Sequence, residues 1–478
     1  MSNVAEETVQ PRENKMGYLP IPKLLASVSL PMMISMLVLS LYNIVDSIFV
    51  GMLSENALAA VSLAFPVQIL VIAVGSGTGV GVNAILSRSL GEKNFDRADK
   101  AAGNGILLAL ASSVLFIILG FTLVKPFFVS QTTHADPEIY TYGVQYLSVI
   151  CIFSFAVFCQ SMLERLLQST GKTFYTMITQ ATGAIINIIL DPLFIFGIGF
   201  FPKMGIAGAA IATVIAKVIE LAWALLVMMK KDSVKIRLGW AIRPDKVLLR
   251  DFWKYTAPIL GDELMWGLGF TMYSVIMGHM GSDAAAANSI ANIVKNLVIC
   301  FCTGIATASG IMVGSLLGQG ELEKAKEYGR KLSKTSIFAG AVAGVIILGV
   351  IPFTPMFSTL TDTAKEYLRV MLVVCSYYVV GKSINMTVIS GIFAAGGDSK
   401  FGFICDGITM WCVTVPIGLI AAFVLKLPVL TVYILINVDE IIKLPAVLKN
   451  YRKYRWVKNL TRQETAPVEP ETMAQTAA

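Results

Sequence analysis

The sequence predicts an all-α polytopic membrane protein, with twelve transmembrane helices in two six-helix lobes related by an internal parallel repeat. Hydrophobic residues make up 55% of the 478 residues and charged residues only 14%, whereas soluble domains carry about 25% charged residues. Twelve apolar stretches can be recognised along the chain, and roughly 20 apolar residues are enough to span a bilayer. The first part of the chain is also repeated in its second half.

The twelve apolar stretches divide evenly between the two halves of the chain. In the first half they cover about 24–50, 57–87, 103–128, 140–168, 173–198 and 205–229. In the second half they cover about 253–278, 284–316, 332–358, 365–393, 401–425 and 428–448. We therefore expect an N-lobe at 21–229 and a C-lobe at 251–450, joined by a cytoplasmic linker at 230–250. Residues 1–20 and 451–478 are expected to be cytoplasmic tails, the second of them basic and disordered.

A repeat without gaps relates the two lobes. Residues 31–98 align with residues 258–325 at an offset of 227, and 18 of the 68 pairs are identical. Six spans per lobe is an even number, so both lobes should have the same orientation about an axis along the membrane normal. Two similar membrane halves are typical of a secondary transporter. The identical pairs include Pro31/Pro258, Ser47/Ser274, Gly51/Gly278, Gly77/Gly304 and Gly91/Gly318.

The net charge of +7 is distributed as in a membrane protein. Lys and Arg collect in alternate connections between the spans, among them 88–100, 230–250, 324–334 and 452–458. The positive-inside rule places these connections and both termini in the cytoplasm. We therefore expect a multi-pass protein of the plasma (inner) membrane, with the lipid bilayer as a partner and no role for nucleic acid.

The composition also argues against an enzyme. All seven cysteines fall inside predicted spans, where we interpret them as small packing residues. The two histidines, His134 and His279, fall on predicted outer turns, and no His or Ser nucleophile constellation is visible. The glycine-rich stretch at 75–81 lacks the lysine of a phosphate loop. Without a nucleotide-binding domain, transport energy must come from an ion gradient or the membrane potential.

Polar residues in three N-lobe spans are candidate cation ligands, because a charge inside a bilayer costs about 2.5–3.5 kcal/mol on insertion scales. Asp46 lies in the first span, and Tyr42 lies one helical turn before it on the same face. Asn187 and Asp191 share a face of the fifth span, and Thr213 in the sixth could add a hydroxyl. Hard oxygen ligands suit Na⁺, and a carboxylate can also exchange protons. The alternatives are a structural role for Asp46 and a capped helix end for the other pair.

Two prolines accompany these carboxylates. Pro31 lies fifteen residues before Asp46 in the same span, and Pro192 follows Asp191 directly. Proline removes a backbone hydrogen bond and can kink a helix. We interpret Pro31 as a hinge that couples ion binding at Asp46 to bending of the first span. The alternative is that Pro31 serves packing alone.

The seventh span carries a different set of charges. Asp262 and Glu263 are adjacent, so their side chains point about 100° apart. We interpret them as a substrate site or a second cation site, and the alternative is an ion pair with Lys295 or Lys382. Weaker candidates are Asp406, Asp439 and Glu440, of which the last two could pair with Lys443.

These motifs resemble the multidrug and toxic compound extrusion (MATE) family over about residues 20–455. The matching motifs are Pro31 with Tyr42-x-x-x-Asp46, Asn187-x-x-x-Asp191-Pro192, the glycine-rich stretch at 205–213 and the turn at 91–98. The resemblance implies two lobes that form a V and alternate between outward- and inward-facing states. It also implies coupling-ion roles for Tyr42, Asp46, Asn187, Asp191 and Thr213, with Na⁺ possible at Asp46, Asn187 and Asp191.

We therefore expect an H⁺- or Na⁺-coupled antiporter that exports organic cations and drugs by alternating access. No cofactor is expected besides the transported ion, and we expect a monomer because one chain contains both lobes. The alternative is a lipid-linked sugar flippase of the same superfamily. Such flippases tend to carry a cavity rich in Arg and Lys, whereas the candidates here are mostly acidic. Lys295 and Lys382 keep this alternative open.

Overall fold

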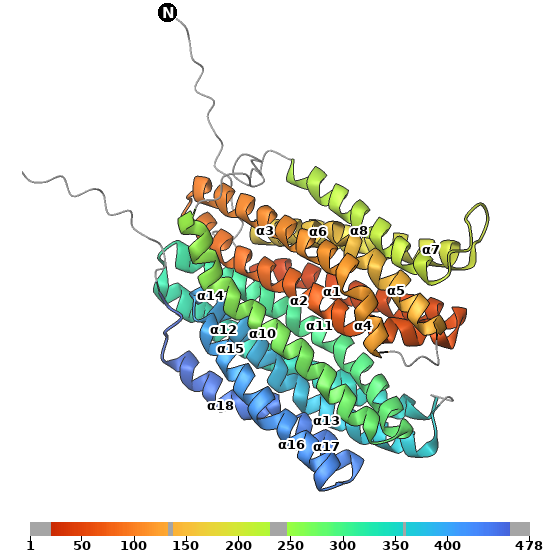
Figure 1. Cartoon of the computed structure of the whole chain (residues 1–478). Helices are drawn as coiled ribbons and strands as arrows, with labels where there is room; N and C mark the ends of the chain where they lie inside the picture. The colour runs from red at the N-terminus through yellow and green to blue at the C-terminus, as the bar shows by residue number, and fades with distance from the viewer. Residues whose placement is uncertain (1–20, 132–136, 230–245, 357–359, 459–478) are drawn as a thin grey trace, which may run out of the picture.

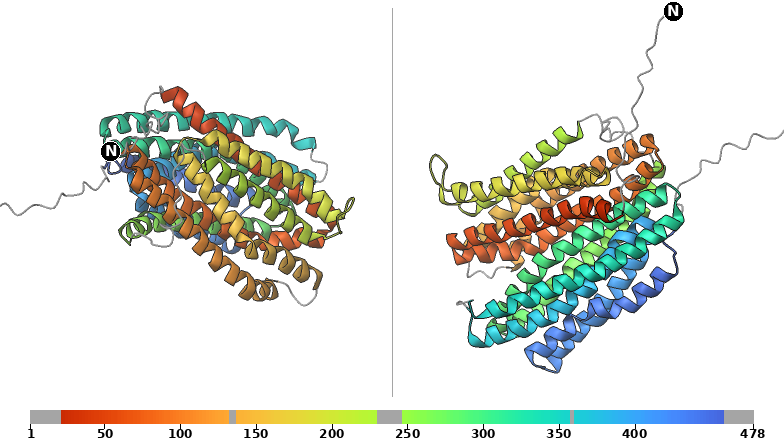
Figure 2. Two further views of the ribbon diagram at one scale, coloured as in Figure 1. Left: turned by 90° about the horizontal axis from the view of Figure 1, so that it is seen from above. Right: turned by 180° about the vertical axis from the view of Figure 1, so that it is seen from behind.

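The computed structural model describes residues 21–131, 137–229, 246–356 and 360–458, and every regular element in these ranges is a helix. Two helical bundles lie side by side (Figure 1), one from the first half of the chain and one from the second. Figure 2 shows the same division from above and from behind. The all-α fold in two lobes is thus confirmed. The tail at 1–20, the linker residues 230–245, the tail residues 459–478 and His134 lie outside the described residues.

The N-lobe contains six spans, of which the fourth is a bent pair of helices with an angle of 48° between them. A short helix, α4 (Val124–Gln131), follows the third span. The spans are α1 (Ile21–Leu53), α2 (Glu55–Gly91), α3 (Phe95–Thr122), the pair α5 (Pro137–Ile152) and α6 (Ser154–Ser169), α7 (Thr173–Phe196) and α8 (Ile206–Met228).

The C-lobe begins with three long helices, α10 (Lys246–His279), α11 (Ser282–Gly318) and α12 (Leu322–Val350), the last extended by the 3₁₀ turn η2 (Ile351–Met356). The next two spans contain π-helical turns, which are frequent at functional sites. The fourth span is α13 (Asp362–Met386), η3 (Thr387–Phe393) and α14 (Ala394–Gly396). The fifth is α15 (Ser399–Gly407), η4 (Ile408–Thr414), α16 (Val415–Leu419) and η5 (Ile420–Val424). The sixth is the broken pair α17 (Val429–Ile436) and α18 (Asp439–Arg452).

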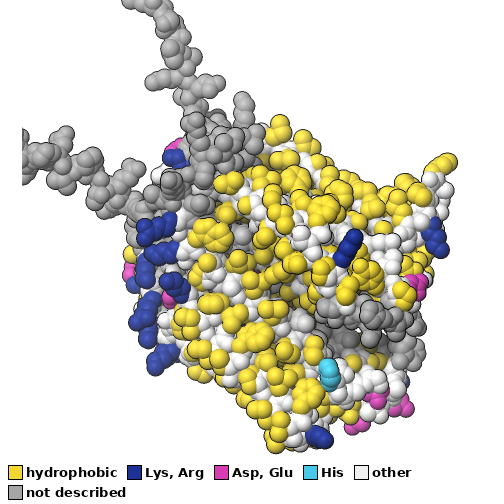
Figure 3. Space-filling model, viewed as in Figure 1, with side chains coloured by type: hydrophobic (Ala, Val, Ile, Leu, Met, Phe, Trp, Pro, Cys, Tyr) yellow, Lys and Arg dark blue, Asp and Glu magenta, His cyan; other side chains and the backbone are white. Residues whose placement is uncertain are grey.

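Length and apolarity agree with a membrane location. Within the described ranges, nine helices could cross a membrane by these criteria, and ten when α5 and α6 count as one span. The long helix α10 and the broken pair α17–α18 complete the twelve. Apolar side chains cover most of the surface seen in Figure 3, while Lys and Arg gather at one end, which we call the basic end. The connections α2–α3 and α11–α12 belong to this end.

Two of the glycine pairs that repeat in the sequence, Gly91/Gly318 and Gly77/Gly304, lie where the two lobes meet. At the basic end, Gly91 of α2 faces its repeat partner Gly318 of α11, and a Cβ on Gly91 would lie 3.2 Å from the Cα of Gly318. The same added Cβ would lie 2.3 Å from the carbonyl oxygen of Ser315. Only small residues allow backbones to approach this closely. Because equivalent residues of the two lobes face each other, a pseudo-two-fold axis passes between them, as the sequence repeat predicts.

A second pair of glycines shows the same symmetry. A Cβ on Gly77 of α2 would lie 2.9 Å from the Cα of Leu260 in α10. A Cβ on Gly304 of α11 would lie 2.6 Å from the Cγ of Met33 in α1. Leu260 is the repeat partner of Met33, just as Gly304 is that of Gly77. Each lobe therefore packs its first helix against the second helix of the other lobe.

A buried arginine also joins the lobes at the basic end. Arg88 of α2 is 7% exposed, and its guanidinium donates hydrogen bonds to backbone carbonyls of α14 in the other lobe. The distances are 2.8 Å from Nε to the Ala395 oxygen and 3.3 Å from an Nη atom to the Ala394 oxygen. These carbonyls lie at a helix C-terminus, where a positive charge is favourable.

The first helix continues through Pro31 as one element. Proline has no amide hydrogen, so the carbonyl of Ser27, four residues earlier, lacks its usual helical partner. The hydroxyl of Thr173, in the first turn of α7, donates to that carbonyl at 3.2 Å. This contact ties α1 to α7, the two helices that carry the predicted N-lobe carboxylates.

Candidate functional site

Three N-lobe helices bring the predicted coupling residues together. Asn187 and Asp191 lie one turn apart on α7, and the Asn187 amide donates to a carboxylate oxygen of Asp191 at 3.3 Å. The same amide nitrogen lies 3.3 Å from the Thr213 hydroxyl of α8. Asp191 has no exposed surface and Asn187 is 1% exposed. On α1, Asp46 is half-buried and is an electrostatic neighbour of Asp191.

This cluster, Asp46, Asn187, Asp191 and Thr213, contains more acceptors than donors. Buried oxygens of Asp46, Asn187 and Asp191 have no hydrogen-bond partner. A buried polar atom without a partner costs about 1–3 kcal/mol. A proton or a small cation would supply the missing partner, and amide, hydroxyl and carboxylate oxygens are suitable ligands for Na⁺.

The described residues contain no group of three or more His, Cys, Asp or Glu side chains that could hold a metal ion. A cation at Asp46 and Asp191 would therefore also need the oxygens of Asn187 and Thr213. All seven cysteines are free of disulfide bonds, and six of them are buried. The six buried cysteines lie within helices, as expected of packing residues, whereas Cys412 is exposed.

Tyr42 connects the cluster to a set of buried charges that the sequence analysis missed. The ammonium of Lys217 in α8 lies 5.9 Å from the centre of the Tyr42 ring. Lys217 also pairs with Glu220 at 2.9 Å, and the two side chains are only 12% and 3% exposed. Glu164 of α6 accepts a hydrogen bond from the Gln180 amide at 2.8 Å and keeps its other oxygen without a partner.

A signal for these residues was present in the sequence. Glu164, Lys217 and Glu220 all fall inside predicted spans, where any charge is a functional candidate. The spacing of Lys217 and Glu220 also predicts an ion pair on one helix face. These residues therefore extend the polar interior of the N-lobe beyond the five predicted ones.

The structure places the C-lobe candidates in separate surroundings. Asp262 of α10 is an electrostatic neighbour of Asp406 of α15, and one of the Asp262 oxygens is buried without a partner. Lys382 pairs with Glu440 at 3.1 Å. Among the described residues, no ion pair within 4.0 Å joins Asp262 or Glu263 to Lys295 or Lys382, so the alternative ion pair is not formed here.

Glu263 lies where the two lobes meet. It lines a cavity of about 60 Å³ together with Arg165 of α6 and with residues of α2, α11 and α13. Lys382 and Arg165 are its electrostatic neighbours, the second of them from the other lobe. A negative and a positive side chain from different lobes thus face one small cavity.

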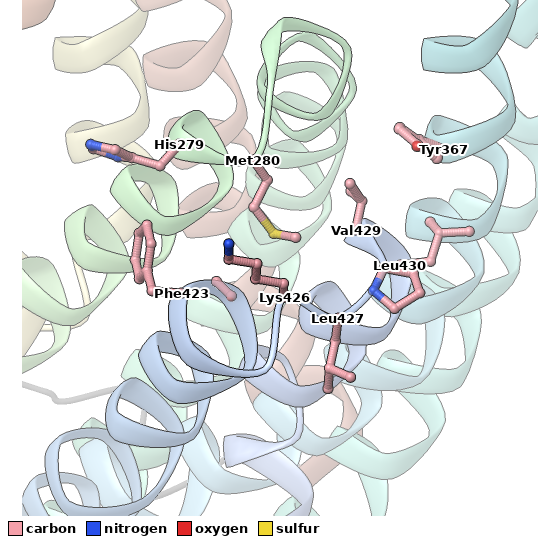
Figure 4. Close-up of a pocket in the computed structure, with 10 residues that line it drawn as sticks. His279, Met280, Tyr367, Phe423, Lys426, Leu427, Val429 and Leu430 are labelled. Carbon is pink, nitrogen blue, oxygen red and sulfur yellow. The ribbon is translucent and has the colours of Figure 1, made fainter.

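A larger pocket of about 410 Å³ lies at the end of the C-lobe opposite the basic end. Figure 4 shows His279, Phe423 and Lys426 among the residues that line it. The lining contains no carboxylate. None of its residues belongs to the candidate site described above. The volume of this pocket therefore gives no reason to place ion coupling there.

Comparison with known proteins agrees with this arrangement. A model of the MatE family matches residues 31–193 and again residues 258–420, an offset of 227 at both ends. The chain is 24% identical to the probable multidrug resistance protein NorM of Thermotoga maritima, over 94% of this chain and 97% of the relative. It is 27% identical to an FAD transporter of Shewanella oneidensis, over 64% and 68%.

Solved structures of this family have the same fold. An outward-facing multidrug resistance transporter superimposes with a TM-score of 0.83 at 23% identity, covering 92% of this chain and 97% of its own. A MATE protein in the straight conformation superimposes with a TM-score of 0.84 at 24% identity, covering 94% and 99%. Twelve helices in two lobes are thus a shared architecture.

Proposed function

Because the chain belongs to the MatE family of membrane transporters, we propose that it exports organic cations in exchange for H⁺ or Na⁺. The observation that carries this proposal is the set of buried oxygens without donors on Asp46, Asn187 and Asp191. A Na⁺ ion could coordinate these oxygens, and a proton on one carboxylate could be shared with one neighbouring oxygen. Thr213 and Tyr42 complete the proposed coupling site, the first by its hydrogen bond to Asn187 and the second by its place one turn before Asp46.

The direction of exchange follows from the contacts between the lobes. Gly91, Gly318 and Arg88 hold the lobes together at the basic end, which the positive-inside rule assigns to the cytoplasm. A cation would then reach Asp46 from the outer side. Its binding would bend α1 at Pro31 and release the exported cation outside. This scheme places both termini in the cytoplasm of the plasma (inner) membrane and needs one monomer.

The acidic residues favour a cationic substrate. Glu263 lines the cavity between the lobes, and Asp262 lies next to it in α10. An organic cation that displaces Arg165 from the neighbourhood of Glu263 would find a negative partner there. The named relatives are a probable multidrug resistance protein and an FAD transporter, and the lipid-linked sugar flippase is not favoured.

The test is ethidium efflux from proteoliposomes that contain the purified chain, with Na⁺ and pH gradients imposed separately. We expect one of the gradients to drive efflux and Asp46→Asn to reduce it to the rate without a gradient. Asp96→Asn is the matched control, because the Asp96 side chain is 65% exposed at the basic end. Efflux by folded Asp46→Asn protein at the unaltered rate would contradict the proposed coupling site.

A further inference from the structure

The twelfth span is interrupted near its middle. α17 ends at Ile436 and α18 begins at Asp439, so Asn437 and Val438 are not helical. The side-chain amide of Asn437 donates to the Tyr433 carbonyl at 2.9 Å, which gives that carbonyl a partner at the break. A helix break leaves backbone carbonyls and amides without helical partners. Within a membrane it is tolerated only where the backbone is buried in protein or lines a cavity.

Asp439, the first residue of α18, has no exposed surface, and neither of its carboxylate oxygens has a hydrogen-bond partner. Its neighbour Glu440 is equally buried but accepts from Lys382 at 3.1 Å, from Lys443 at 3.0 Å and from the Asn385 amide at 2.8 Å. The two adjacent carboxylates therefore differ completely in their partners. Helix N-terminal amides favour a negative charge at Asp439 but do not satisfy its oxygens.

The buried lysine Lys295 faces the same region but does not pair with Asp439. Lys295 of α11 has its ammonium 3.5 Å from the Asn437 side-chain oxygen and 4.8 Å from the centre of the Tyr378 ring. No ion pair within 4.0 Å joins it to Asp439 in the described structure. The charged and titratable groups around Asp439 come from four helices: Tyr273 on α10, Lys295 on α11, Tyr378 and Lys382 on α13, and Glu440 and Lys443 on α18.

The internal repeat relates this place to the N-lobe cluster. At the offset of 227, Tyr273 takes the place of Asp46 and Thr414 that of Asn187. The hydroxyls of Tyr273 and Thr414 lie 2.7 Å apart, and Tyr273 is an electrostatic neighbour of Asp439. The C-lobe thus keeps oxygen atoms at the two equivalent positions. Its carboxylate comes instead from the start of α18.

We propose that Asp439 is a second site for one positive charge, a proton or a monovalent cation, in the C-lobe. The charge would bind to the Asp439 carboxylate at the start of α18 and satisfy the oxygens that the protein leaves without a donor. This site is separate from Asp262 and Glu263 and from the N-lobe cluster. It requires no particular exported substrate, so it can be tested without transport.

The test compares purified full-length variants in detergent. The starting variant carries Asp46→Asn and Asp191→Asn, which removes the two carboxylates of the proposed coupling site and leaves Asp439 untouched. The second variant adds Asp439→Asn to this background. The control adds Asp362→Asn instead, because the Asp362 side chain is fully exposed. Proton binding is followed by the infrared carboxyl band between acidic and alkaline buffers. Na⁺ binding is followed by calorimetry, with choline chloride as the reference.

We expect the starting variant and its control to bind one charge that the Asp439→Asn variant does not bind. Loss of one infrared carboxyl band in the Asp439→Asn variant would identify the bound charge as a proton. Loss of the heat of Na⁺ binding in that variant would identify it as Na⁺. If neither signal differs among the three variants, the proposal is wrong. If Asp439→Asn prevents folding, the starting variant alone decides, because absence of both signals in it overturns the site. Coupled efflux through Asp46 could hold in either case, so the two proposals fail independently.

Discussion

Single buried residues define the chemistry of this protein. Asp191 and Asp439 have no exposed surface, yet each keeps carboxylate oxygen without a donor. Glu440, by contrast, has two lysine partners. A fully paired buried carboxylate contributes structure, whereas an unpaired one costs free energy that a bound charge can offset. The difference between these two kinds of residue is invisible in the sequence, because all three are acidic residues in apolar spans.

The buried pair of Lys217 and Glu220 should stabilise the N-lobe. We expect Lys217→Met to lower the free energy of unfolding by about 3–5 kcal/mol, because it leaves Glu220 buried without its cation. The measurement is unfolding of the purified protein by denaturant in detergent. Lys331→Met is the control, since Lys331 and Glu327 are 52% and 50% exposed, and such pairs contribute about 0–1 kcal/mol. Equal losses in both variants would contradict this role.

At the scale of helices, proline and π-helical turns mark where regular hydrogen bonding is replaced by other contacts. Pro31 leaves the Ser27 carbonyl to the Thr173 hydroxyl. The tenth and eleventh spans contain the π-helical turns η3, η4 and η5. The predicted spans match the helices closely, because long apolar stretches in lipid must satisfy every backbone group as helices. The break at Asn437 was not predicted, although Asn437 and Asp439 are residue types that favour helix boundaries.

Pro31→Ala should impair the proposed bending of α1. Alanine restores a helical donor for the Ser27 carbonyl and removes the ring that weakens the helix at this point. We expect the initial rate of coupled efflux to fall while the affinity for the exported cation, measured by fluorescence binding, stays unaltered. Pro66→Ala in α2 controls for the general effect of replacing an intrahelical proline. An unaltered efflux rate in Pro31→Ala would show that Pro31 serves packing alone.

For the whole molecule, the repeat explains the interface. Gly91 and Gly318 face each other because equivalent positions in two similarly oriented lobes meet at the axis between them. The sequence predicts the equivalence of these glycines. Their contact depends on how the lobes pack, and small side chains make that approach possible. The same packing brings Arg165 and Glu263 to one cavity.

Gly91→Leu should open the basic end. Its side chain would collide with the Ser315 carbonyl, 2.3 Å from the added Cβ. Spin labels at Met52→Cys and His279→Cys occupy repeat-equivalent positions at the opposite end of the molecule. We expect the distance between these two labels to be shorter with Gly91→Leu than without it. The background carries Cys412→Ser, because Cys412 is the exposed cysteine. Gly278→Leu has open space around its Cβ and should leave the distance unaltered.

The orientation in the membrane can be tested by labelling. Lys324 at the basic end is 61% exposed by its side chain, and Phe200 between α7 and α8 is fully exposed. We expect an impermeant thiol reagent to label Phe200→Cys in intact cells and Lys324→Cys only after permeabilisation, both in the Cys412→Ser background. The reverse pattern would mean that the basic end faces outside, against the positive-inside rule.

The sequence by itself determined the helical membrane fold, the two lobes and the equivalence of their first two helices. It also identified most of the charged residues that are candidates for function. These follow from apolar length, repeat register and the cost of charge in lipid. Only the tertiary structure decided which charges are paired. It joined Lys382 to Glu440 and Lys443 to Asp406, and left Asp191 and Asp439 with oxygens lacking donors. Pairing depends on which helix faces touch and where a helix breaks, and both are set by packing between distant segments.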